Sequence, residues 1–174
     1  MQTITPFLWF DDQAEEAANL YVSVLGGRTG SSAGRGESKI LDVTRYSKAS
    51  AEAGGRPERS VMTVSFMLDG QEFVALNGGP QFPFSEAVSF VVNCESQEEV
   101  DELWDKLSAG GEQGPCGWLK DRFGLSWQIV PEALTQMLSD PRSGDSQAAL
   151  QAMLKMKKLD IAGLERAYNG SRVA

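Results

Sequence analysis

The sequence predicts an α+β fold made of two β-α-β-β-β modules that form curved mixed sheets, followed by a C-terminal helical extension. Two matches between the halves of the chain support this prediction. Residues 7–27 match residues 90–110 in type at a shift of 83 positions, and residues 69–76 match residues 123–130 at a shift of 54. In both halves an apolar strand precedes an amphipathic helix, and further strands follow. Because a duplicated module implies pseudo-twofold architecture, we expect a ligand site between the copies.

Composition excludes several classes of function. The 174 residues suffice for a substantial core, and 24 acidic against 16 basic residues give a net charge of −8. This charge argues against a nucleic-acid surface, which needs clustered Lys and Arg, and against an anionic membrane surface. Cys94 and Cys116 need not form a disulfide. Since no signal peptide and no apolar stretch of about 18 residues is visible, we expect a cytoplasmic protein.

The absence of histidine is the most restrictive feature of the composition. It excludes Ser-His-Asp and Cys-His catalysis within this chain, and it excludes zinc or iron sites built from His. Any general acid or base must therefore be a carboxylate, Lys, Cys or Tyr.

The first module is predicted to extend over residues 1–79. Aromatic and β-branched residues at 3–10 indicate a strand, and Pro6 within it suits an edge or a bulge. Asp12 is the predicted cap of a helix, with Glu15 three residues further on. The glycine pair at 26–27 is expected to end this helix.

Residues 28–60 make the first module longer than the second by 29 residues. Alternating residue types at 39–46 predict a strand, whereas glycine-rich 30–36 and residues 49–59 are expected to be loops. The excess is expected to be either a plain surface insertion or a mobile lid.

A hairpin is predicted at the end of the first module. Strands at 61–68 and 72–76 flank Asp69-Gly70, a strong signal for a two-residue turn. The segment from Asn77 to about Phe84 is then a linker to the second module.

The second module is predicted to extend over residues 86–131. It begins with a strand at 87–93, and Ser96 and Glu99 form a capping box for the helix that follows. Two short strands are expected around 118–120 and 125–130.

The segment 132–174 lies outside the repeat and is predicted to be helical. A short helix is expected at 131–138, a second at 146–158, and a third after Asp160, which is its predicted cap. We expect this tail to pack on the paired domain of residues 1–131 or on a dimer partner.

With the β-α-β-β-β pattern read twice, the chain resembles the vicinal oxygen chelate superfamily of glyoxalases, bleomycin resistance proteins and dioxygenases, and within it the PhnB-like branch. The resemblance implies the glyoxalase-like fold and a homodimer. It also implies the label 3-demethylubiquinone-9 3-methyltransferase, which proteins of this branch often carry. The segments that carry the resemblance are 4–11, 14–17, 84–90, 117–128 and 153–165.

Metal-dependent members of the superfamily hold a divalent ion with His, Glu or Gln side chains from the first and last strands of each module. Carried over to this chain, the four positions fall within 4–6, within 87–89, at Val74 and at Gln128. Only Gln128 keeps a plausible donor. Because a hard divalent ion needs several oxygens and a softer one needs His or Cys, we expect no metal and no other cofactor.

Four residues are candidates for a ligand pocket or for the core. Gln128 either hydrogen-bonds an organic ligand through its amide or is a buried strand residue satisfied by the backbone. Trp9, Trp118 and Trp127 lie on or beside strands, where aromatic rings line pockets or simply fill the core. Neighbours on one strand point to opposite faces, so Trp127 is core if Gln128 faces the pocket.

Catalytic candidates are few. Cys116 lies in a Gly-rich loop and is either a nucleophile or an inert thiol. Glu86, at the junction of the modules, is either a general base or a solvated linker carboxylate. Lys120, Asp121 and Arg122 are predicted to form a turn with solvated charges, and only Lys120 is expected to reach the pocket.

The leading hypothesis is that the protein binds a small organic molecule between the sheets without a metal, as resistance proteins of this superfamily shield their ligands. The alternative is an enzyme, a lyase, isomerase or transferase, that uses carboxylate, Lys or Cys chemistry. A third hypothesis is an interaction protein whose Met-bearing tail recruits a partner. The Gly-Gly pairs follow predicted helices, so they do not resemble the strand-to-helix turns that commonly bind S-adenosylmethionine.

Overall fold

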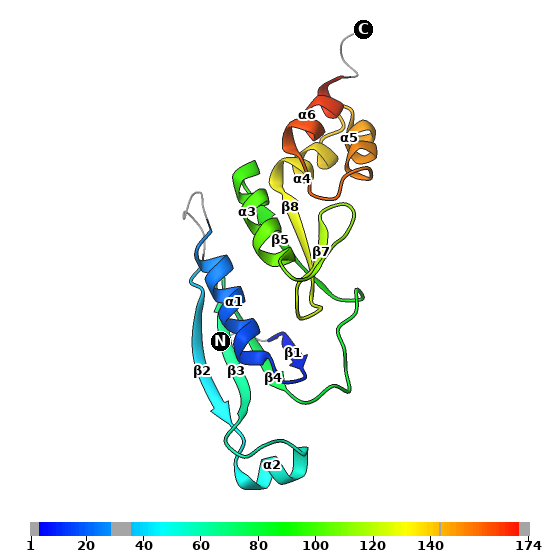
Figure 1. The fold of residues 1–174 in the computed structure, drawn as a ribbon. Helices are drawn as coiled ribbons and strands as arrows, with labels where there is room; N and C mark the ends of the chain where they lie inside the picture. Colours follow the sequence, from blue (N-terminus) through cyan, green and yellow to red (C-terminus); the bar gives the residue numbers. More distant parts are fainter. Residues whose placement is uncertain (1–3, 29–35, 143, 171–174) are drawn as a thin grey trace. The chain divides into compact units, whose positions relative to one another are not determined.

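The structure is a computed structural model that describes residues 4–28, 36–142 and 144–170. The chain forms two compact units, residues 1–84 and residues 85–174. Each unit contains a four-stranded mixed sheet, and the described residues form six helices in all (Figure 1). The predicted α+β class with two repeated modules and C-terminal helices is therefore confirmed. None of the helices in the described residues is both long and apolar enough to cross a bilayer.

The first unit has the strand order β1-β4-β3-β2, with β1 parallel to β4 and the other pairs antiparallel. Helix α1 covers one face of this sheet, and its buried residues include Ala17 and Tyr21. The elements in chain order are β1 (Phe7–Phe10), α1 (Ala14–Gly26), β2 (Lys39–Arg45), α2 (Lys48–Gly54), β3 (Val61–Leu68) and β4 (Gln71–Asn77).

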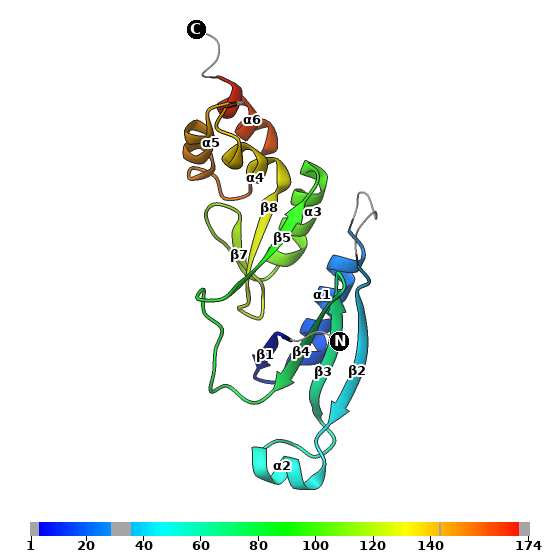
Figure 2. The ribbon, with the colours of Figure 1, turned by 180° about the vertical axis from the view of Figure 1, so that it is seen from behind.

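The second unit repeats this arrangement with the order β5-β8-β7-β6, and helix α3 packs on its sheet. Three further helices follow the last strand, and Figure 2 shows them gathered at the end of β8. The elements are β5 (Ser89–Cys94), α3 (Gln97–Ser108), β6 (Glu112–Gln113), β7 (Trp118–Lys120), β8 (Ser126–Pro131), α4 (Glu132–Ser139), α5 (Ser146–Met153) and α6 (Ile161–Gly170).

The first strand is shorter than predicted, because it begins at Phe7 rather than at residue 3. Pro6 immediately before it has no N–H to donate to a ladder, although its carbonyl still accepts from the Val74 N–H at 3.0 Å. The predicted cap of α1 is also wrong. The N-cap is Gln13 without a capping side chain, and the Ala14 N–H instead donates to Asn77 Oδ1 at 2.8 Å.

Residues 28–60 are more regular than predicted. The strand expected at 39–46 is confirmed as the edge strand β2, but the loop expected at 49–59 is wrong, since it contains helix α2. Ser47 caps α2 in a reciprocal box with Ser50, and Gly55 ends it in the left-handed conformation. The predicted loop at 30–36 lies, apart from Gly36, outside the described residues.

The hairpin between β3 and β4 is confirmed. Asp69 and Gly70 both have positive φ angles, 49° and 79°, as a type I′ turn requires. This turn suits the twist of the flanking strands, which explains why Asp-Gly is an informative pair here.

Only part of the predicted capping box of α3 forms. Ser96 Oγ accepts from the Glu99 N–H at 3.3 Å, as predicted. The Glu99 carboxylate, however, accepts from the N–H of Glu95 at 2.8 Å rather than from that of Ser96. Glu99 is fully buried, so this bond satisfies a carboxylate that would otherwise be costly inside the core.

Sheet register corrects the repeat by one residue. Phe7 lies opposite Val74 in the first sheet, and Val91 lies opposite Gln128 in the second. If Val74 corresponds to Gln128, then Phe7 corresponds to Val91, and the first strands of the two modules are related by a shift of 84 positions. The helices, which start at Ala14 and Gln97, are related by a shift of 83. The difference arises because the connection from strand to helix is one residue shorter in the second module.

The three C-terminal helices pack around a small core of their own. Helix α5 ends at Met153, so the helix predicted at 146–158 is too long. The third helix begins as predicted, because Asp160 Oδ2 accepts from the Gly163 N–H at 3.1 Å. The buried residues of this core are Leu134, Met137, Ala149, Leu159, Leu164 and Tyr168.

Candidate functional site

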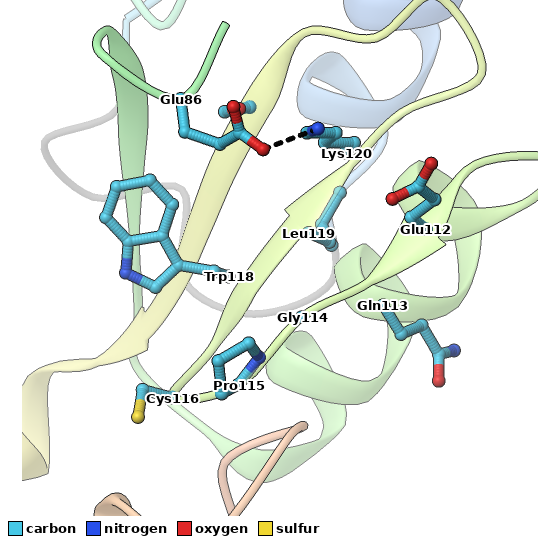
Figure 3. A pocket seen from close by; sticks show the side chains of 10 residues that line it. Glu86, Glu112, Gln113, Gly114, Pro115, Cys116, Trp118, Leu119 and Lys120 are labelled. Atoms are coloured by element: carbon cyan, nitrogen blue, oxygen red, sulfur yellow. Dashed lines mark ion pairs between the residues drawn. The ribbon is translucent and has the colours of Figure 1, made fainter.

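A cavity of about 390 Å³ lies within the second unit, beside the β6–β7 hairpin. Figure 3 shows Pro115 and Cys116 at one end of it, the Glu86–Lys120 pair at the other, and Trp118 between them. The residues that line it are Glu86, Glu112, Gln113, Gly114, Pro115, Cys116, Trp118, Leu119, Lys120 and Ser126.

Alternation along β7 brings the functional side chains to the open face of the sheet. Leu119 is 2 % exposed and points to the helix-covered face, so its neighbours Trp118 and Lys120 point to the opposite one. In the register of the sheet, Lys120 lies between Glu112 on β6 and Ser126 on β8. Three polar side chains thus form one row across the sheet.

Glu86 and Lys120 form an ion pair with a distance of 2.5 Å from Oε1 to Nζ (Figure 3). The hydrogen bond from Lys120 lowers the pKa of Glu86, and the same bond raises the pKa of Lys120. Glu112 acts on Lys120 in the same direction through its charge. Both members of the pair therefore carry their full charge at neutral pH.

Ser126 was not foreseen as a site residue. It is 1 % exposed, and its Oγ has no hydrogen-bond partner in the described part of the chain. A buried hydroxyl without a partner costs about 1–3 kcal/mol, so it calls for a bound water or a ligand atom. No local sequence signal marks this serine, because its burial depends on the neighbouring strands.

Gln128 is half-buried on the open face of β8, where Trp118 is its cross-strand neighbour. Its Nε2 donates to Ser89 Oγ at 2.8 Å, so a side-chain hydroxyl and not the backbone satisfies this group. Trp127, the next residue, is buried on the other face, as the alternation predicts. Gln128 is not among the residues that line the cavity.

Asp121 contradicts the prediction of a solvated turn. It is 2 % exposed, and its Oδ1 accepts from the N–H groups of Phe123 at 2.9 Å and Leu125 at 3.1 Å. Its Oδ2 accepts from Trp127 Nε1 at 2.9 Å. The bond to the amide two residues on is an Asx turn, a local signal from which the sequence could have predicted this role.

Trp9, a predicted pocket residue, lies in the first unit. Its Nε1 donates to the Gly79 carbonyl at 2.8 Å. Its ring packs edge-on against that of Phe82, with 5.0 Å between the ring centroids. A side chain at residue 78 would clash with this indole, so Gly78 is required for the packing. The contacts of Trp9 are thus with its own unit's linker.

The two cysteines differ in environment. Cys94 is buried, whereas Cys116 is partly exposed and has a φ of 58°, a left-handed conformation that is unusual for a residue with a side chain. Cys116 lines the cavity, as do Glu86, Trp118 and Lys120, so four of the six residues proposed from the sequence gather at one place.

The positions equivalent to metal ligands in the superfamily do not fit a metal ion. Val74 offers no donor, and Gln128 offers only a single amide oxygen, while its Nε2 donates to Ser89. In residues 4–28, 36–142 and 144–170, no three side chains of the types His, Cys, Asp or Glu lie close enough together to hold a metal. We therefore assign no metal-dependent step to this site.

Comparison with known proteins identifies the family of the chain. A family model described as 3-demethylubiquinone-9 3-methyltransferase matches residues 2–130. The PhnB protein from Bacillus cereus is 33 % identical, with a TM-score of 0.60, over 75 % of this chain and 99 % of that one. A comparison with curated proteins finds no match.

Two more distant structures share the fold alone. Protein PA1353 from Pseudomonas aeruginosa is 21 % identical with a TM-score of 0.54, over 75 % of this chain and 98 % of that one. The fosfomycin resistance protein FosX from Mesorhizobium loti is 9 % identical with a TM-score of 0.51, over 80 % of this chain and 98 % of that one. The chain thus belongs to the 3-demethylubiquinone-9 3-methyltransferase family and is PhnB-like.

Proposed function

We propose that the protein binds a small organic molecule, without a metal, in the cavity beside the β6–β7 hairpin. The observation that carries this proposal is the cavity itself, which combines the apolar Trp118 and Pro115 with the polar Glu86–Lys120 pair. A volume of about 390 Å³ is in the usual range for small-molecule sites. Gln128, one cross-strand position from Trp118, is the proposed polar contact at the cavity's edge.

The charges around the cavity favour a neutral or cationic ligand. Glu86 and Glu112 contribute two carboxylates, whereas Lys120 contributes one ammonium group that is already paired. An anion would therefore have to displace Glu86 from Lys120. An amine attached to an aromatic ring would instead meet two carboxylates and the face of Trp118, which attracts cations.

The pKa shifts support binding over proton-transfer catalysis. A general base should have a pKa near the working pH, but Lys120 holds the pKa of Glu86 below its ordinary value. Lys120 in turn has a raised pKa, so it is a poor nucleophile. The enzyme alternative with Glu86 as its general base is therefore the less favoured one. The homodimer and the cytoplasmic location stay predictions.

Titration with 2-phenylethylamine is expected to shift the indole N–H signal of Trp118 in a ¹H–¹⁵N NMR spectrum. A fragment of this size should bind at about millimolar concentration. Phenylacetate, which has a similar size and the opposite charge, should bind at least several-fold more weakly. Trp118→Leu lacks this reporter, so its binding is read from the backbone amide signals of the other cavity residues, whose shifts should be abolished. The Trp9 signal reports whether this second predicted pocket residue takes part.

Absence of any shift with either compound would contradict the proposed cavity site. A stronger response to phenylacetate would contradict the charge argument, while leaving a binding role in place. Lys120→Met separates the two cases, since it removes the one ammonium group that an anion needs and leaves Glu86 free to meet an amine.

Titration with zinc, nickel, manganese and iron(II) is expected to show no stoichiometric binding at micromolar metal concentration. The reason is the donor set, because Val74 has no ligating atom and a single amide holds no divalent ion tightly. Isothermal titration calorimetry measures this directly. Micromolar binding that disappears in Gln128→Ala would refute the metal-free proposal.

A further inference from the structure

We propose that the C-terminal extension holds one wall of the cavity in shape, so that docking of residues 156–161 and occupancy of the cavity are coupled. The coupling rests on the proposed binding function, whereas the structural role of the extension does not. This extension lies beyond residue 130, where the match to the family ends. Residues 156–161 therefore lie outside the part of the chain that the family model matches.

Two backbone hydrogen bonds join the extension to the cavity wall. The Cys116 N–H donates to the Met156 carbonyl, and the Gly117 N–H donates to the Lys157 carbonyl, both at 2.8 Å. On its other side, the Gly117 carbonyl accepts from the Ile129 N–H at 2.8 Å. The turn at 116–117 thus lies between β8 and the extension and is hydrogen-bonded to both.

The turn needs such support because its backbone is unusual. Cys116 and Gly117 have consecutive φ angles of 58° and 83°, and an L residue such as Cys116 rarely adopts this conformation. Leu159, which is fully buried, packs against Gly117 so closely that a side chain there would lie 3.1 Å from Leu159 Cδ1. The extension therefore both bonds the turn and fills the space beside it.

Helix α3 anchors the extension through Gln97 and Asp101. The Gln97 amide donates to the Leu159 carbonyl at 3.1 Å and accepts from the Ile161 N–H at 2.8 Å. Asp101 pairs with Lys158 at 2.8 Å, and the hydrogen bond from Lys158 lowers the pKa of Asp101. Because Gln97 satisfies both a donor and an acceptor of the extension, its loss should loosen the segment more than loss of the partly exposed ion pair.

The reactivity of the Cys116 thiol measures the state of the turn without any ligand. In a Cys94→Ala background, Gln97→Ala is expected to raise the rate of reaction with 5,5′-dithiobis(2-nitrobenzoate) about three- to tenfold, and Lys158→Met should raise it less. Lys106→Met is the matched control, because Lys106 lies on the same helix and pairs with Glu102, away from the extension. This control should react at the parental rate.

Affinity for 2-phenylethylamine provides the second measurement. It should fall in Gln97→Ala and Lys158→Met and stay unchanged in Lys106→Met, with far-ultraviolet circular dichroism as the check on folding. Thiol rates that stay parental in both anchor variants would overturn the structural role of the extension. Raised thiol rates with unchanged affinity would overturn the coupling. If the parent fails to bind the amine at all, the proposed function fails, but the thiol rates still decide the role of the extension.

Discussion

Replacing Asp121 by alanine is expected to lower the free energy of unfolding by about 3–5 kcal/mol, the range for removing one partner from a buried charged network. The carboxylate is buried and accepts from the amides of Phe123 and Leu125 and from the Trp127 indole. Alanine would leave these donors without their acceptor inside the protein. Urea denaturation followed by circular dichroism measures the loss.

Two companion variants make the Asp121 result specific. Asp121→Asn keeps an oxygen that can accept from the two backbone amides, so its cost should be smaller than that of alanine. A cost remains because its amide N–H group can face the Trp127 indole N–H. Arg122→Ala changes the next residue of the same turn, whose exposed side chain stacks over Phe123 with 5.0 Å between its guanidinium carbon and the ring centroid. It should cost less than about 1 kcal/mol. Equal costs for Asp121→Ala and Arg122→Ala would contradict a special role for the buried carboxylate.

Asn77→Ala is expected to lower the free energy of unfolding by about 2–3 kcal/mol, because it removes a helix cap and a second, partly buried hydrogen bond. Asn77 Oδ1 accepts from the first N–H of α1, and its Nδ2 donates to the Val61 carbonyl at 3.1 Å. Thermal or urea unfolding of the full chain measures the effect.

Asp12→Ala is the informative comparison for Asn77. The sequence pattern predicts Asp12 as the cap of α1, yet the structure gives that role to a residue from β4. We therefore expect Asp12→Ala to change stability by less than about 0.5 kcal/mol, as exposed substitutions usually do. A larger cost for Asp12→Ala than for Asn77→Ala would contradict this assignment.

The elements that the sequence predicted well are those specified by local patterns. The Asp69-Gly70 hairpin, the C-terminal end of α1 and the cap of α6 each depend on residues within a few positions of one another. Helix α2 was not predicted because Gly54, Gly55 and Pro57, at and after its end, indicate a loop. The Ser47–Ser50 box and the alanines that follow it indicate a helix. In that case the local signal was present and was outweighed by turn residues around it.

The candidate site was partly foreseeable. Trp118 and Lys120 share a strand face by alternation, and Glu86 and Cys116 stood out as chemically capable side chains. Glu112 and Ser126 could not be found in this way, because their place beside Lys120 follows from the pairing of three strands. The burial of the Ser126 hydroxyl is likewise a property of its neighbours rather than of its own sequence context.

The sequence by itself determined the duplicated module, the family and the extra helical segment, since periodic burial and repeated residue types are written along the chain. Only the tertiary structure decided which side chains complete these elements. Asn77 caps a helix 63 residues away, and Gln97 holds a carbonyl 62 residues away. The physical reason is that an unsatisfied backbone group accepts any suitably placed partner, and packing, not sequence proximity, sets which partner arrives.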